Sequence, residues 1–520
     1  MTKPNDSTTE TQGQPHIRWW PAAAILLLAV VAVVWVRFFK AVSHQEQNIG
    51  TAAIALAATA LWLLWVLFFS RLKWRIRFWV VGGVLVPILV TAILFRIRGV
   101  SGDLVPIFEW RWHGRTARRI ETAPSKPPGQ NLRPPVVDYP QFLGPNRNAT
   151  VAELPLARHW KAHPPAQIWR GPVGAAWSGF AVVAPYAITQ EQRAEEEAVV
   201  CYDLLSGKEM WVHGDAAHYR TTLAGEGPRA TPTIVSNRVY ALGAMGLLNC
   251  LDLSSGKVIW SKNIIEDNQS KLNEWGMSGS PLALEDLVLV SAGGRNGRSL
   301  VAYHAAHGGF VWGGGQDGAG YSSPFPTTLA GDRQILIFNA HSIAGHDALS
   351  GQVLWEYPWP GGHPHVALPV VLPEDRVLVS SGYGTGSELL KIKKDGAWSA
   401  ARLWKSNRLK AKFTNVVYLD GHIYGLDDGI MVCLDASNGE LEWKEGRYGH
   451  GQVILTGHLL LIMAESGDVV LMEPTPQEHR ELTRFTAFKG KTWNPPALAG
   501  EYLLVRNDKE AACYRLPLVK

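Results

Sequence analysis

A recurring eleven-residue segment limits what this chain can fold into more than any other feature does. "CYDLLSGKEMW" (201–211) returns as "CLDLSSGKVIW" (250–260), and both contain an Asp, a Gly four residues later and a Trp eight residues later. Self-similarity with a period of roughly 20–50 residues is typical of solenoids and propellers. The repeat is therefore the strongest indication of the architecture.

The pattern occurs five times without gaps, and one of these five copies has His304 in place of Asp. Degenerate copies end at Trp404 and near Phe485. Counted from Trp169, the final positions lie 42, 49, 52, 43, 49, 39 and 42 residues apart. The turn positions are Asp203, Gly207 and Trp211; Asp252, Gly256 and Trp260; Gly308 and Trp312; Asp347, Gly351 and Trp355; Asp435, Gly439 and Trp443.

The chemistry of the repeat is that of a tight turn between strands. An Asp side chain can accept hydrogen bonds from backbone amides just after it, and Gly adopts the positive φ that a hairpin needs. Each unit opens with small residues, as in "RATPTIV", and continues into an apolar strand such as "RVYALGA". Four strands in each unit of this length predict a propeller blade.

The expected fold is all-β: an eight-bladed propeller of four-stranded antiparallel blades, preceded by three transmembrane α-helices. The last unit stops after three strands, so the segment around Trp169 is expected to supply its fourth strand and close the ring at about 166–518. Closure of this kind removes the open edges of the first and last sheets. Arg147 precedes the ring in the sequence.

Three apolar runs near the N-terminus, at about 20–39, 49–69 and 78–95, are long enough to cross a bilayer as helices. We expect an N-terminal tail at 1–18, a membrane region at 19–95, a juxtamembrane segment with a proline-rich linker at 96–137, and the propeller domain at 138–520. "LVPIFEWRW" in the juxtamembrane segment fits one strand or an interfacial stretch. Basic residues flank the runs on both sides, so charge alone leaves the orientation open.

Charge is divided unevenly along the chain. Residues 1–133 carry 16 Lys and Arg against 6 Asp and Glu, which leaves 34 against 39 in the remainder. A mildly acidic body with a basic membrane-proximal end argues against a nucleic-acid partner, which needs the basic face on the folded domain.

On these repeats the chain resembles propellers of the pyrroloquinoline-quinone (PQQ) enzyme type, which include the non-enzymatic assembly lipoprotein BamB. The D-x-x-[ST]-G-x-x-x-W turn is that family's tryptophan-docking motif. "DYPQFLGPNR" (138–147) and "SGYGTGSELLKI" (381–392) look like a membrane-anchored bacterial subset. The resemblance implies a multi-pass protein of the bacterial inner membrane, with its N-terminus inside and its propeller in the periplasm.

For function, the leading interpretation is a membrane-tethered, non-catalytic scaffold that binds a protein partner in the cell envelope, with the membrane itself as a second partner. The alternative is a PQQ-dependent quinoprotein oxidoreductase of the alcohol or sugar dehydrogenase type that passes electrons to the membrane. A sensor is a third possibility, but we find no cytoplasmic output domain for it. One fold hosts all of these activities.

No cofactor is expected under the leading interpretation, and PQQ with Ca²⁺ only under the alternative. The family's dehydrogenases commonly carry a disulfide between adjacent cysteines, whereas Cys201, Cys250, Cys433 and Cys513 are far apart. We interpret them as small buried residues. His363 and His365 have no third ligand nearby in sequence, so we expect a solvated loop pair and no metal site. No catalytic constellation is recognisable.

The mouth of the central channel is the predicted ligand site, because polar and aromatic residues stand where the inner strands begin. Packing and strand capping are the alternative role for them. A guanidinium at 229 flanked by the rings of residues 275 and 321 would suit a planar anion or an acidic loop. The candidate residues are Arg229, Trp275, Ser278, Tyr321, Ser322, Lys412, Asn415, Trp493 and Asn494.

Overall fold

The computed structural model describes residues 18–40, 43–112 and 137–519. It contains two compact units, residues 1–114 and 115–520, which are described separately. The predicted tail lies almost wholly outside the described residues, and so does most of the proline-rich linker.

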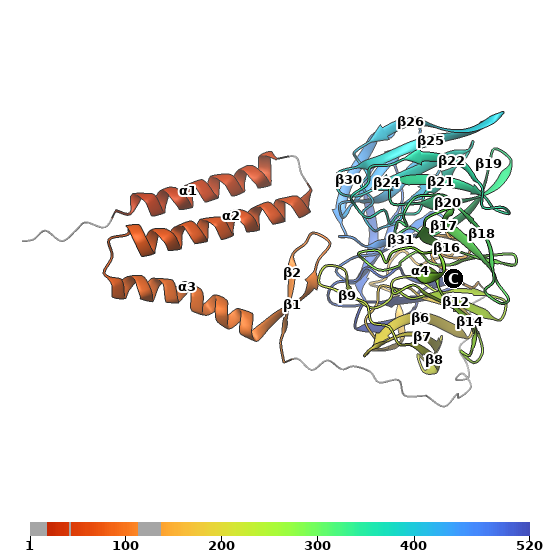
Figure 1. Cartoon of the computed structure of the whole chain (residues 1–520), viewed down its shortest axis with the longest axis horizontal. Coiled ribbons are helices and arrows are strands. Elements are labelled where there is room, and N and C mark those ends of the chain that lie inside the picture. The colour runs from red at the N-terminus through yellow and green to blue at the C-terminus, as the bar shows by residue number, and fades with distance from the viewer. Residues whose placement is uncertain (1–17, 41–42, 113–136, 520) are drawn as a thin grey trace, which may run out of the picture. The chain divides into compact units, whose positions relative to one another are not determined.

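The N-terminal unit consists of three apolar helices and a β-hairpin (Figure 1). The helices are α1 (Trp20–Val34), continued by a π-helical turn (Trp35–Phe39), α2 (His44–Leu64), continued by a second (Trp65–Phe69), and α3 (Trp74–Leu94). By length and composition, all three are able to cross a membrane.

Two helices begin earlier than the apolar runs predict. Ser43 accepts the backbone N–H of Glu46, and the Glu46 carboxylate accepts the backbone N–H of Ser43, so a capping box starts α2 five residues before Ile49. Helix α3 starts at Trp74, and Phe95, expected to be its last residue, already belongs to a strand. Helix α2 thus begins five residues before the expected run and α3 four residues before it, and α3 ends one residue before Phe95.

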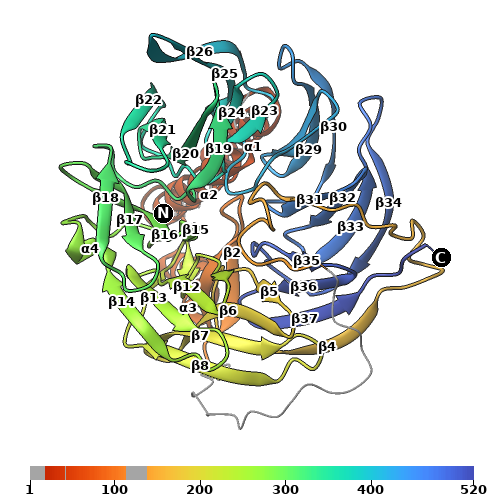
Figure 2. The ribbon, with the colours of Figure 1, turned by 90° about the vertical axis from the view of Figure 1, so that its right-hand side faces the viewer.

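The second unit is an eight-bladed propeller, and Figure 2 shows its sheets arranged radially. Blade 1 is β5 (Ala181–Val183), β6 (Tyr186–Arg193), β7 (Glu196–Asp203) and β8 (Glu209–Asp215); blade 2 is β11 (Thr233–Val235), β12 (Arg238–Leu242), β13 (Leu247–Asp252) and β14 (Val258–Asn263). Blade 3 is β15 (Leu282–Leu284), β16 (Leu287–Gly294), β17 (Arg298–His304) and β18 (Phe310–Gly314); blade 4 is β19 (Phe325–Leu329), β20 (Asp332–Phe338), β21 (Ser342–Asp347) and β22 (Val353–Pro358).

Blade 5 is β23 (Val370–Leu372), β24 (Arg376–Ser381), β25 (Gly386–Asp395) and β26 (Ala397–Ser406); blade 6 is β27 (Val417–Leu419), β28 (His422–Asp427), β29 (Ile430–Asp435) and β30 (Leu441–Arg447). Blade 7 is β31 (Gln452–Thr456), β32 (Leu459–Met463), β33 (Asp468–Glu473) and β34 (Arg480–Thr486); blade 8 is β35 (Ala497–Ala499), β36 (Tyr502–Arg506), β37 (Glu510–Arg515) and β4 (Ala166–Pro172). The predicted closing strand is confirmed: β4 pairs antiparallel with β37, and Trp169 lies opposite Cys513.

One blade departs from the predicted four strands. β3 (Thr150–Val151) adds a parallel strand to the inner edge of blade 7, opposite Leu455 and Thr456. A short hairpin, β9 (Arg220–Thr221) with β10 (Gly225–Glu226), and one helical turn, α4 (Ile264–Asp267), decorate the loops after blades 1 and 2.

The tryptophan of one blade packs on the glycine turn of the next. A Cβ added at Gly207 would lie 2.6 Å from Trp169 Cδ2, and one added at Gly439 would lie 2.6 Å from Trp404 Cε3. The Trp169 indole N–H donates to Leu204 O at 2.7 Å, which joins blade 8 to blade 1. The same contact joins Trp211 to Gly256, Trp260 to Gly308 and Trp312 to Gly351.

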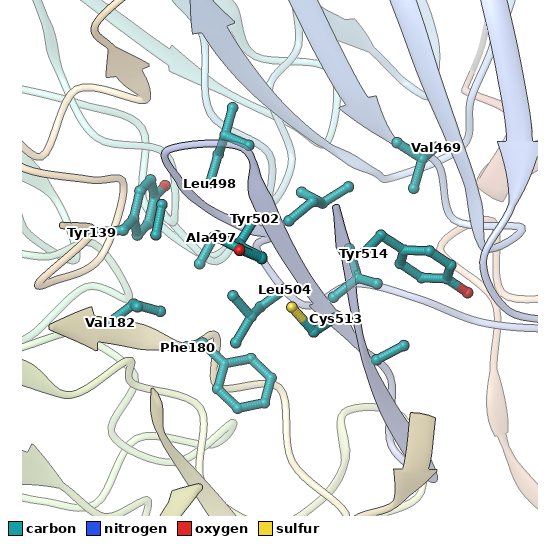
Figure 3. Close-up of a cluster of buried hydrophobic side chains, with 14 of the residues drawn as sticks. Tyr139, Phe180, Val182, Val469, Ala497, Leu498, Tyr502, Leu504, Cys513 and Tyr514 are labelled. Carbon is teal, nitrogen blue, oxygen red and sulfur yellow. The ribbon is translucent and has the colours of Figure 1, made fainter. Parts of the chain in front are cut away.

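The core lies between the blades, and Figure 3 shows it between blade 8 and its neighbours. Phe180 and Val182 of the first blade face Ala497 and Leu504 of the last, with exposed fractions of 1% or less. Cys201, Cys250, Cys433 and Cys513 are all buried free thiols. Burial raises the pKa of the Cys250 thiol to about 11, so these groups behave as small apolar side chains.

Arg147 precedes the first blade in the sequence, yet its side chain lies inside the propeller. Its guanidinium is fully buried and donates to Ser280 O and Pro281 O of blade 3 at 2.9 Å each and to Gln141 Oε1 at 3.0 Å. Two residues later, Ala149 O accepts the backbone N–H of Leu455 in blade 7. Blades 3 and 7 stand opposite each other in a ring of eight, so the segment 139–151 crosses the propeller axis and fills part of its channel.

Candidate aromatic mouth of the channel

The candidate site is built from the loops that lead into the inner strands. At the same offset, four residues before the inner strand, stand Trp177 (β5), Arg229 (β11), Tyr321 (β19), Phe413 (β27) and Trp493 (β35). The small residues after each let the blades approach the axis, so the large side chains gather at one end of the channel. We call this end the mouth.

Aromatic rings form a continuous chain along one side of the mouth. Trp177 and Trp493 have ring centroids 4.9 Å apart, Phe413 lies 4.9 Å from Trp493, and His450 lies 4.8 Å from Phe413. These four side chains come from blades 1, 8, 6 and 7. Rings at such distances attract one another and present a large, stiff contact surface.

Lysines lie over these rings. Lys491 Nζ is 4.0 Å from the Trp493 centroid and 4.6 Å from that of Trp177. Lys412 Nζ is 4.8 Å from the centroid of Tyr383 and 5.8 Å from that of Phe413. Each ammonium is attracted by the ring faces, which fixes positive charge at the mouth.

Arg229 lies beside Trp177, because both side chains donate to Ala224 O, and its ring partner is Tyr219 at 4.3 Å. Its guanidinium donates to the carbonyl groups of Gly227, Ala224 and Gly225 in its own loop. Burial lowers its pKa to about 10, while Tyr219 and Glu197 favour the cation. Arg229 is therefore held in place by its loop.

Trp275 and Tyr321 meet through a backbone contact, because the Trp275 N–H donates to Tyr321 Oη at 3.3 Å. Burial raises the pKa of Tyr321 to about 12 and that of Tyr383 likewise to about 12. Both phenols are thus neutral at physiological pH and present O–H groups and rings.

Four other candidate residues make bonds between neighbouring blades. Ser278 Oγ donates to Tyr321 O at 3.0 Å, Ser322 Oγ to Ala367 O at 3.2 Å, and Asn494 Nδ2 to Ala176 O and Ser178 O at 3.0 and 2.8 Å; Asn415 Oδ1 accepts the Leu368 N–H at 3.1 Å. These polar groups close the ring around the axis, and they are engaged by the fold.

Glu197, in the first blade, is the acidic group with the most unusual environment near Arg229. It is 3% exposed, its Oε1 has no hydrogen-bond partner among the described residues, and burial raises its pKa to about 7. A carboxyl with this pKa exchanges protons near neutrality. Its burial keeps it away from any bound molecule, so we assign it no role in chemistry.

The expectation of a solvated loop pair in "GGHPHVALP" was wrong for one of its two histidines. His365 is buried, stacks on Phe338 at 4.4 Å and bonds Asn339 O and Pro360 O, whereas His363 is exposed and stacks on Tyr383 at 4.8 Å. They do not point to a shared ligand. Across the described ranges, no group of three or more His, Cys, Asp or Glu side chains gathers as an ion site would require.

Sequence reasoning missed Trp177, Tyr219, Tyr383, Phe413, His450 and Lys491 at the mouth. The signal for Trp177 and Phe413 was available, because each stands at the same offset from its inner strand as Arg229 and Trp493 do. Tyr219 comes from the loop that carries the β9–β10 hairpin and Tyr383 from the β24–β25 turn, and neither follows the repeat.

The protein thus combines an eight-bladed propeller, whose channel mouth carries aromatic rings and cations, with three helices able to cross a membrane. A family model described as outer membrane protein assembly factor BamB matches residues 195–445. The repeats in this part of the propeller are thus similar to those of the BamB family.

Solved structures with this fold include BamB and quinohemoprotein alcohol dehydrogenases. BamB from Moraxella catarrhalis is 16% identical, with 68% of this chain and 99% of that chain covered and a TM-score of 0.50. A quinohemoprotein alcohol dehydrogenase from Pseudomonas putida HK5 is 12% identical, with 74% and 81% covered and a TM-score of 0.53. One from Comamonas testosteroni is 12% identical, with 74% and 82% covered and a TM-score of 0.52. No curated protein matches the chain.

Proposed function

We propose that this protein is a non-catalytic binding module, tethered to the bacterial inner membrane, whose propeller lies in the periplasm and binds a protein partner at the mouth. The observation that carries the proposal is the kind of side chain found there: stacked rings with ammonium groups over them. Rings of this kind supply contact area at low entropic cost and dominate protein interfaces.

The expected partner is an acidic peptide segment with apolar side chains. Lys491 and Arg229 favour carboxylates, and the rings of Trp177, Trp493 and Phe413 favour apolar or planar groups beside them. The polar side chains nearest the axis form hydrogen bonds between neighbouring blades. These bonds keep the mouth rigid, as a preformed recognition surface requires.

A quinoprotein oxidoreductase remains the second candidate, because two quinohemoprotein alcohol dehydrogenases have the same fold. Likeness in fold alone does not carry an activity across.

Site-specific photo-crosslinking in cells tests the proposal. A crosslinking residue at His363, which is exposed at the mouth, should give one discrete adduct, and a matched residue at Leu349, which is 68% exposed on the turn after β21, should not. Trp493→Ala, made in the His363 background, should abolish the adduct. Identical adducts from both positions, or an adduct that survives Trp493→Ala, would show that the mouth is not the binding surface.

A further inference from the structure

We infer that the hairpin after the third helix is a membrane-surface element: one of its faces lies in the boundary between lipid headgroups and acyl chains. The hairpin is formed by β1 (Phe95–Val100) and β2 (Pro106–Trp110). This inference does not depend on the function proposed for the propeller.

The two faces of the hairpin differ in chemistry. Phe95 lies opposite Trp110 and Ile97 lies opposite Phe108 in the strand pairing, so these four side chains share one face. The Phe95 and Trp110 rings meet edge to face at 5.3 Å, and Trp112 continues the aromatic group 5.6 Å from Trp110.

The opposite face is charged. Arg96 donates to Glu109 at 2.8 Å, and Arg98 lies 3.7 Å from the same carboxylate. Arginine and glutamate thus occupy the alternate positions, and the hairpin has the period-two amphipathic pattern of a strand pair at a boundary between apolar and polar phases.

The apolar face is exposed. The exposed fractions are 48% for Ile97, 58% for Phe108, 44% for Trp110 and 61% for Trp112. A folded protein rarely leaves so many large apolar side chains together in water, and such a patch marks an interaction surface.

Position along the chain indicates the bilayer as the occupant. Helix α3 ends at Leu94 and β1 begins at Phe95, with no residue between them. The backbone N–H of Arg111 donates to Leu94 O at 2.8 Å, and its guanidinium donates to Ala92 O at 2.8 Å. At the other end, Asn48 Nδ2 near the start of α2 donates to Asp103 O at 2.8 Å. The hairpin is therefore bound to the end of one apolar helix and the beginning of another (Figure 1).

The depth of the hairpin in the membrane is limited by the hydrogen bonds that its backbone needs. A two-stranded hairpin has two open edges, and open sheet edges exposed to lipid do not occur in the hydrocarbon core. Trp and Phe side chains, by contrast, are favoured at the headgroup level. The hairpin must then lie flat at the surface, with its rings toward the acyl chains and its arginines toward the headgroups and water.

Fluorescence quenching tests this in the full chain reconstituted into vesicles of phosphatidylethanolamine and phosphatidylglycerol at 3:1. Bimane is attached to Ile97→Cys or Phe108→Cys, one from each strand, and to Arg98→Cys as the matched control on the charged face. The four native thiols are buried, so the parent protein gives the labelling background.

We expect labels at 97 and 108 to lose most of their emission to lipid that carries a doxyl group on acyl carbon 5, and little to aqueous iodide. The label at 98 should show the reverse. Quenching by iodide at 97 and 108 equal to that at 98 would place the apolar face in water. Protection of both labels from both quenchers would mean that protein covers the face, and either result overturns the inference.

Discussion

At the scale of single residues, buried contacts near the axis hold the segment 139–151 across the channel, where it fills part of the space. Arg147 is the clearest case, because its fully buried guanidinium satisfies two carbonyl groups of blade 3 and one side-chain amide. Its place in the fold could not be predicted from the repeat, since the segment that carries it contains no copy of the repeat.

Arg147→Ala is expected to destabilise the propeller by about 3 kcal/mol, because it leaves buried acceptors without a donor and creates a cavity. Guanidinium unfolding of the solubilised full chain, followed by tryptophan fluorescence, measures this. Arg158→Ala is the matched control, since Arg158 is 48% exposed and paired with Glu473, and exposed pairs contribute roughly 1 kcal/mol or less. Equal losses in the two variants would contradict the placement of Arg147.

Glu197 gives stability a pH dependence whose sign is fixed by its environment. Burial raises its pKa from 4.5 to about 7, so between these values the native state binds more protons than the unfolded state. Stability then falls as pH rises from about 4.5 to 7 and stays level above that.

Glu197→Gln should therefore be more stable than the parent at pH 8, by up to about 3 kcal/mol, and nearly equal to it at pH 5. Unfolding free energies at the two pH values measure the difference, and Glu478→Gln, at an exposed position, serves as the control. A constant offset between variant and parent at both pH values would show that Glu197 does not titrate in this way.

At the scale of elements, each blade is joined to the next by a tryptophan seated on a glycine turn. The contact between Trp169 and Gly207 is the one that closes the ring, because β4 comes from the N-terminal side of the propeller and Gly207 belongs to blade 1. Gly207 has φ of 66°, so it needs both conformational freedom and an empty Cβ position.

Gly207→Ala should destabilise the ring more than Gly297→Ala does, by roughly 1–3 kcal/mol. Both glycines have positive φ, 66° and 77°, but a Cβ at Gly297 would meet nothing within 4 Å. Comparison of the two variants therefore separates the cost of backbone strain, which both share, from the cost of the clash with Trp169, which only the Gly207 variant has. Hydrogen exchange that is no faster in β4 and β5 of the Gly207 variant than in the Gly297 variant would contradict this role.

The strands were predictable where the chain repeats itself, whereas the mouth was predictable only in part. The Asp, Gly and Trp positions set blade number and ring closure, because turn chemistry is local in sequence. The mouth depends on which rings meet across blades: Arg229 was expected between Trp275 and Tyr321, but its ring partner is Tyr219. Contacts between blades join residues far apart in the chain, and no spacing rule describes them.

At the scale of the whole molecule, the proposal assigns attachment to the apolar helices and recognition to the propeller. The helices are able to cross a membrane by length and composition, and the propeller offers a mouth of stacked rings and fixed cations. Enzymes and binding proteins share this fold. Because the fold is compatible with either activity, the central claim of the proposal is that this protein is not a catalyst.

Reconstitution of the purified full chain with PQQ and Ca²⁺ tests that claim most directly. After removal of free quinone, the protein is expected to show no bound-quinone absorbance, and no reduction of an artificial electron-acceptor dye when alcohols or sugars are supplied. Quinone retained near one equivalent, together with substrate-dependent dye reduction, would contradict the account and establish the protein as a quinoprotein oxidoreductase.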